Sequence, residues 1–294
     1  MKSNLIKIYE SKKEIDFLNE EYYGLRRNPF YEVNNFIYGI DKNLNKNYLD
    51  NLQDLKVLPD YHRDSLCSYD YENNIAYSKG GKADAFVLFH VASNDRTKEN
   101  TGVIDSEGNG YGLNTGITEL FTYKVNNISL MYQVETFMAE IMYCLYKDEL
   151  ANSYFNNNSN ILKSANPNIN DVMLYLDQYH DNYIKLISLN RSIFSKERFY
   201  YNQVYGDTLK EKDDELNSIY ESIYKLESAN ITYCNSLLDY IIKMIEKSNI
   251  SQGEKLNILL KVKNTFTKIT SKEDFDYLSE VNNNVLSNMK RLVK

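Results

Sequence analysis

Tryptophan is absent from this 294-residue chain, and proline, cysteine and histidine occur only three times each. The three cysteines, Cys67, Cys144 and Cys234, lie far apart in the sequence. Their odd number and wide spacing argue against a disulfide framework, because such frameworks pair cysteines in even sets. Reduced thiols are typical of proteins kept in a reducing compartment. We therefore expect a cytoplasmic protein.

Long apolar runs are also missing. The most apolar stretch, 128–146, is interrupted by Gln133, Glu135 and Glu140. A membrane-spanning helix needs roughly 20 predominantly apolar residues in succession. The first residues of the chain likewise lack the apolar core of a secretory signal. We expect no membrane partner and no secretory signal.

An excess of basic residues is absent as well. The formal net charge is −7, and lysines alternate with acids, most visibly in 210–215. Nucleic-acid binding requires clustered Lys and Arg side chains that neutralise phosphates. The charge pattern therefore predicts no nucleic-acid partner.

Helical patterns dominate what the sequence does contain. Ser11 and Glu14 form a capping box, in which each side chain bonds the backbone N–H of the other residue. Apolar residues spaced for one helix face predict a helix from Ile40 to Leu55 that stops before Pro59. Aromatic and aliphatic residues on both sides of Asn73-Asn74 predict a short β-hairpin over 69–77. A polar break is expected at 156–160, followed by a helix from Asn170.

The C-terminal part is predicted to be wholly helical. Apolar residues keep a near-heptad stripe from Leu209 to Ile245, either as one long helix or as two helices joined near Asn230. Shorter helices are expected over 253–266 and from Ser271 to the end. Packing within the chain is the favoured interpretation of the stripe, and a homo-oligomer formed through these helices is the alternative. The predicted fold is mainly α: a helical domain with a small hairpin over 1–165 and a helical region over 166–294.

Two adjacent stretches carry the pattern that bears on function. The first runs from Asp84 through Phe86 and Val87 to His90, and is an apolar segment of helical length with one histidine. The second follows a glycine-rich turn and reads Leu113-Asn114-Thr115-Gly116-Ile117-Thr118-Glu119.

This layout, over about Tyr69 to Leu150, resembles the gluzincin zinc metallopeptidases. Those enzymes carry His-Glu-x-x-His on one helix and a glutamate ligand in Leu-Asn-Glu-Gly on a second helix. With the chain aligned on His90, the first zinc histidine falls on Phe86 and the general-base glutamate on Val87. The third ligand falls on Thr115. Phe and Val can neither coordinate zinc nor activate water.

The resemblance therefore implies a metallopeptidase-like domain whose zinc site is lost, with no catalytic residue, metal or cofactor. The remnant of the former site would be Phe86, Val87, His90, Asn114, Thr115 and Glu119. Phe86 and Val87 are expected in the core. Glu119 is expected either to hydrogen-bond His90, directly or through a water, or to be an ordinary carboxylate near a helix start. His90 itself is either a buried core histidine or a ligand.

Other motifs in the sequence are incomplete. The stretch 105–110 resembles the start of a calcium-binding EF-hand loop, but Gly116 stands where the bidentate glutamate is needed. Cys67 and His62 could form a nucleophile–base pair, but the sequence offers no third residue to orient the histidine.

Three functions remain open from the sequence. The leading hypothesis is an inactive metallopeptidase-like protein that binds an unknown protein or peptide partner through the former active-site cleft. The first alternative is a hydrolase with a site rebuilt from His62, His90 and Glu119. The second alternative is an oligomerising helical scaffold.

Overall fold

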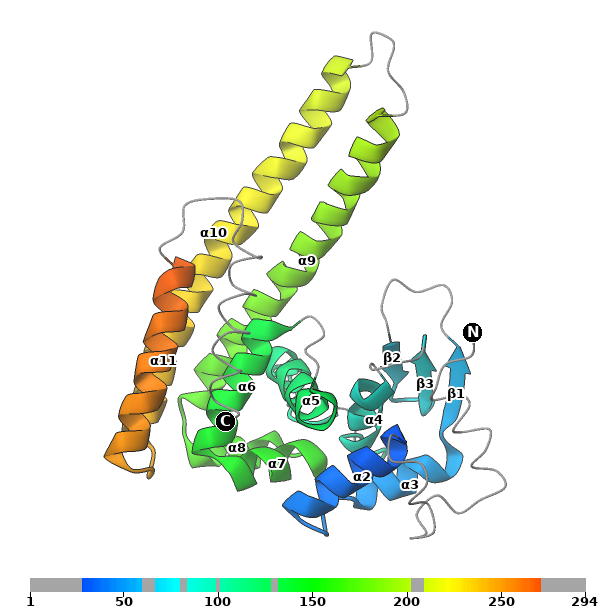
Figure 1. Ribbon diagram of the computed structural model, residues 1–294, viewed down its shortest axis with the longest axis vertical. Helices are drawn as coiled ribbons and strands as arrows, with labels where there is room; N and C mark the ends of the chain where they lie inside the picture. Colours follow the sequence, from blue (N-terminus) through cyan, green and yellow to red (C-terminus); the bar gives the residue numbers. More distant parts are fainter. Residues whose placement is uncertain are drawn as a thin grey trace. The chain divides into compact units, whose positions relative to one another are not determined.

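The structure is a computed structural model, and it describes residues 28–59, 67–79, 84–98, 101–127, 132–201 and 209–270. These residues form ten helices and one three-stranded sheet (Figure 1). The predicted mainly α fold is therefore confirmed. The chain divides into two compact units, Met1–Pro167 and Asn168–Lys294, whereas the sequence analysis placed the boundary after residue 165. The predicted capping box at Ser11 and Glu14, His62 and the helix from Ser271 lie outside the described residues.

The described part of the first unit begins with α2 (Pro29–Ile40) and α3 (Lys46–Asp54). The Asn28 side chain accepts a hydrogen bond from the backbone N–H of Phe30 at 2.9 Å, and proline follows it at the first helical position. This is a typical helix start. The Asn28 side chain satisfies the backbone N–H of Phe30, which has no partner within the helix, and Pro29 has no backbone N–H that would need one.

The predicted helix from Ile40 to Leu55 begins too early, whereas its end is correct within one residue, because α3 ends at Asp54. The chain leaves the helical path after Ile40, where the Asp41 carboxylate accepts from the backbone N–H of Asn43 at 2.8 Å and forms a local turn. Beyond α3 the chain is extended, and β1 (Lys56–Pro59) pairs in parallel with β3 (Ile75–Ser78). Pairing with a distant strand therefore forms β1, which the sequence patterns did not predict.

The predicted hairpin is confirmed. It consists of β2 (Cys67–Asp70) and β3, which are antiparallel with Asp70 opposite Ile75. Asn74 closes the turn with a φ of 53°, a left-handed conformation that asparagine tolerates better than most residues. The strand order is β1-β3-β2, so β3 is the central strand.

Five further helices lie in the described part of the first unit. They are α4 (Asp84–Ala92), α5 (Tyr111–Asn126), α6 (Gln133–Leu145), α7 (Lys147–Phe155) and α8 (Ser159–Ala165). The predicted polar break falls between α7 and α8. The core is strongly aromatic: the Phe121 ring lies 5.7 Å from Phe89, 5.5 Å from Tyr154 and 5.5 Å from Phe155, centroid to centroid. These contacts hold α4, α5 and α7 together.

The second unit contains α9 (Ile169–Tyr201), α10 (Leu209–Lys247) and α11 (Gln252–Thr270). Helix α10 is continuous through Asn230, so the one-helix alternative is correct. Helices α9 and α10 lie side by side as an antiparallel hairpin (Figure 1). Leu186 packs on Ile223, and the Tyr175 ring stacks on Tyr240 with a centroid distance of 5.8 Å. None of the helices in the described ranges is long and apolar enough to cross a membrane.

Candidate functional site

The candidate site is built around α4, which is apolar on almost every side. Phe86 retains 8% of its surface and Val87 none, so the prediction that both are core residues is confirmed. The start of the helix is fixed by a hydrogen bond between the Ser78 hydroxyl of β3 and the Asp84 carboxylate. Its last turn is held by the Tyr154 hydroxyl, which donates to the Phe89 carbonyl at 3.2 Å.

Phe86 lies in contact with two other rings. Its ring centroid is 4.9 Å from that of His90, one helical turn further along α4. On another side it stacks on Tyr132, at 6.4 Å with an interplanar angle of 26°. An aromatic ring thus stands at the position that the resemblance assigns to the first zinc ligand.

Glu119 of α5 holds the start of α6. It is fully buried, and its carboxylate accepts a hydrogen bond from the backbone N–H of Tyr132 at 2.8 Å. Tyr132 directly precedes α6, so the carboxylate satisfies a backbone donor that the helix itself leaves free. A negative charge at this end also interacts favourably with the helix dipole.

Tyr132 in turn is surrounded by acidic groups. Burial raises the pKa of its hydroxyl to about 12, and the carboxylates of Glu135 and Glu119 and the thiol of Cys67 add to the effect. Cys67 comes from β2 and Glu135 from α6. We call the set Cys67, Phe86, His90, Glu119, Tyr132 and Glu135 the Tyr132 cluster. It joins residues of β2, α4, α5 and α6.

His90 is a neutral member of this cluster. Its imidazole makes no hydrogen bond within the described part of the chain, and burial lowers its pKa to about 4. The direct hydrogen bond to Glu119 that the sequence suggested is therefore absent from these residues, and Glu119 binds the Tyr132 N–H instead. At neutral pH the imidazole carries no charge, because its pKa lies well below 7.

The other remnant residues are divided between two places. Thr115 is half-buried and lies one helical turn before Glu119, on the same side of α5. Asn114 acts elsewhere: its side-chain oxygen accepts from the backbone N–H of Val103 at 3.1 Å. Gly102, with a φ of 61°, lies against this oxygen so closely that a Cβ atom would come within 1.8 Å of it. Asn114 therefore holds the loop before α5 rather than the cluster.

No three His, Cys, Asp or Glu side chains gather in a metal-binding group among the described residues. In the stretch that resembles an EF-hand, Asp105 accepts from the backbone N–H groups of Glu107 and Asn109 at 2.9 Å each. The same carboxylate pairs with Lys163 of α8 at 2.6 Å. A lysine ammonium is thus the cation that this carboxylate binds.

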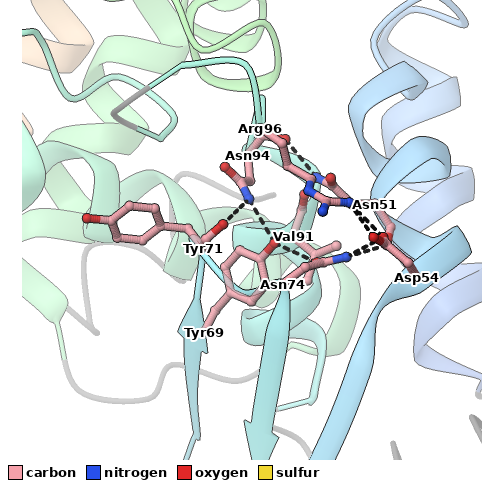
Figure 2. A network of polar contacts seen from close by, with 8 residues as sticks. All are labelled: Asn51, Asp54, Tyr69, Tyr71, Asn74, Val91, Asn94 and Arg96. Atoms are coloured by element: carbon pink, nitrogen blue, oxygen red, sulfur yellow. Dashed lines mark hydrogen bonds and ion pairs between the residues drawn. The ribbon is translucent and has the colours of Figure 1, made fainter.

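A polar network next to the cluster fixes the hairpin and the end of α4 (Figure 2). The Asn51 side chain of α3 donates to the carbonyls of Val91 and Asn94, at 2.8 and 2.7 Å. The Asn74 side chain donates to the Asn51 carbonyl at 2.8 Å. Buried amides satisfied in this way give the local structure a single arrangement.

The same network continues to the surface. The Asn94 side chain donates to the Tyr69 hydroxyl at 2.9 Å and to the Tyr71 carbonyl at 3.1 Å (Figure 2). Arg96 closes it with an ion pair to Asp54 at 2.6 Å. Both partners are about half exposed, so the pair contributes little to stability. The network thus ties β2 and the hairpin turn to the end of α4.

Sequence reasoning did not assign Tyr132 or Glu135 to a site, and it considered Cys67 only as a partner of His62. No local motif joins Cys67, Tyr132 and Glu135, because they come together around Tyr132 only through the packing of separate elements. Comparison of the chain with protein-family models, curated proteins and solved structures finds no match.

Proposed function

We propose that this chain is a catalytically inactive metallopeptidase-like protein that binds a protein or peptide partner. The observation that carries the proposal is the position of Phe86, whose ring packs between His90 and Tyr132 where the resembling enzymes have a zinc ligand. A buried phenyl ring offers no lone pair to a metal and excludes the water that a hydrolase would activate.

The binding surface of this proposal lies between the hairpin, α4 and the first turns of α5. It offers half-buried Cys67, His90, Thr115 and Tyr132, and Tyr71 in the hairpin turn is 43% exposed. Aromatic side chains with a polar tip are favoured in binding sites, because they contribute large contact areas at low entropic cost. With a neutral imidazole beside them, this surface favours an apolar or aromatic peptide over a strongly charged one.

The rebuilt hydrolase receives less support. Its carboxylate, Glu119, is buried and accepts from a backbone N–H, so it is occupied in holding α6. We further propose that the protein is cytoplasmic and has no nucleic-acid partner. The net charge of −7 supports this, as do the three cysteines, which form no disulfide within the described residues.

Zinc content tests the loss of the metal site. Elemental analysis of the purified protein is expected to find no stoichiometric zinc, and about one zinc per chain would overturn the proposal. The double variant Phe86→His/Thr115→Glu is the positive control, because it returns two ligands beside His90. If the frame is that of a gluzincin, the variant binds one zinc per chain, while Phe86→His alone binds it much more weakly. Failure of the double variant to bind zinc, in a folded protein, would count against the resemblance.

A degenerate peptide library tests the binding activity. The wild-type protein is expected to retain a subset of peptides intact, and mass spectrometry of the mixture would reveal any cleavage. Retained peptides should shift the NMR signals of His90 and Tyr71 but leave those of the exposed Tyr224 unchanged. Cleaved products, or retention without any shift at the hairpin and α4, would contradict the proposal.

A further inference from the structure

Helix α10 carries a regular seam toward α9. Ile223, Asn230, Leu237 and Met244 recur at every seventh residue and are all buried. Such a spacing keeps side chains on one stripe of a helix that packs against a partner helix. Ile223 packs on Leu186 of α9, so the stripe, with Asn230 in its middle, faces α9.

Asn230 is an exception within this seam. Its side chain has no exposed surface, and neither its oxygen nor its nitrogen has a hydrogen-bond partner among the residues that the structure describes. A buried carboxamide without partners loses the hydrogen bonds that water gives it in the unfolded chain. The folded hairpin is therefore destabilised at this level.

The surroundings of Asn230 are polar as well. Glu227, one turn earlier on α10, is buried. Because α9 and α10 are antiparallel and Leu186 meets Ile223, Asn230 lies level with about Tyr179 and His180 of α9, and His180 is buried too. Apolar layers lie on both sides of this level. The distal layer lies nearer to Tyr201, the end of α9, and Leu209, the start of α10. It consists of Leu186, Leu189, Ile219, Ile223 and Leu226. The other is Leu176, Leu237, Ile241 and Met244.

We propose that this polar layer divides the α9–α10 hairpin into two parts that open separately. The distal part, beyond Asn230, separates while the part with Leu237 and Met244 stays packed. Separation stops at the polar layer because opening to that point hydrates the Asn230 carboxamide, whereas opening further would expose the apolar layer of Leu176, Leu237, Ile241 and Met244. The hairpin therefore has a closed state and a state in which its distal part is open. The apolar pair Leu186 and Ile223 is buried in the closed state and accessible in the open state. This inference is independent of the proposed peptide-binding function.

Hydrogen exchange along the full-length protein tests this separate opening. Amides of 217–226 in α10 are expected to exchange roughly tenfold or more faster than those of 237–245, with a step at 227–230. Fraying from the helix end would instead give a gradual slope. In Asn230→Leu, which replaces the carboxamide by an apolar group of similar size, the distal amides should slow by roughly tenfold or more and the step should vanish.

The matched control is Asn235→Leu, because Asn235 is an exposed asparagine on the same helix. It should leave the exchange profile unchanged. If Asn230→Leu disturbs folding, Asn230→Ala serves in its place, since it removes the same unpaired group without filling its space. Uniform protection along α10, or a step that persists in the folded Asn230 variants, would overturn the proposal.

Discussion

Gly116 is the residue at which a single methyl group should do the most damage to the candidate site. A Cβ atom at this position would lie 2.2 Å from the carbonyl oxygen of Glu135 and 2.4 Å from its carbonyl carbon. Ordinary contacts of this kind exceed 3 Å, so α6 would have to move away from α5 by about 1 Å. Overpacking of this kind costs up to about 3 kcal/mol. The better helix propensity of alanine returns about 1 kcal/mol. Gly116→Ala should therefore lower the free energy of unfolding by about 2 kcal/mol.

The control for this variant lies in the same unit. Gly39 is near the end of α2, and a Cβ atom there would meet nothing within 4 Å. Gly39→Ala should therefore raise the free energy of unfolding by up to about 1 kcal/mol. Urea unfolding followed by circular dichroism measures both variants with their m-values. If Gly116→Ala is as stable as the wild type, α6 adapts without cost, and the close approach of the two helices does not fix the cluster.

Two further changes test the cluster itself. Phe86→Ala should cost about 3 kcal/mol in a denaturant melt, because it removes a buried ring that packs on His90 and Tyr132; a change near zero would place Phe86 on an open surface. The free energy of unfolding should also include a contribution from neutral His90. This contribution is complete above pH 6.5 and is lost as the pH falls from 6.5 toward 4. The reason is that the unfolded chain binds the His90 proton first, since the folded pKa is about 4. NMR titration measures that pKa directly, and a folded value at or above 6.5 would refute the assignment. His90→Gln should remove this pH-dependent contribution.

Local signals predicted the elements that depend on local chemistry. The hairpin follows from Asn73-Asn74, and the start of α5 follows from a glycine turn in which Gly110 has a φ of 98°. The break between α7 and α8 follows from its polar residues. These features are encoded within a few residues of where they occur, so a reading of the sequence finds them.

Features set by long-range packing could not be found in the same way. No pattern within residues 56–59 indicates a strand, and it is β3 that supplies the strand partners for them. For Glu119, the sequence pointed to His90, whereas the approach of α6 provides a backbone N–H that the carboxylate accepts. The Tyr132 cluster combines four elements, and no spacing along one chain segment indicates such a combination.

The two hydrogen bonds from Asn51 bear on the order in which the first unit folds. Helix α4 has nine residues, fewer than the roughly 12 that a helix needs to persist alone in water. Two carbonyls at its C-terminal end are bound by a side chain that lies 40 and 43 positions earlier in the chain. The end of α4 therefore becomes stable only after α3 has docked and a long loop has closed, and loop closure of this kind slows folding. Helices α3 and α4, with nine residues each, therefore depend on each other for stability.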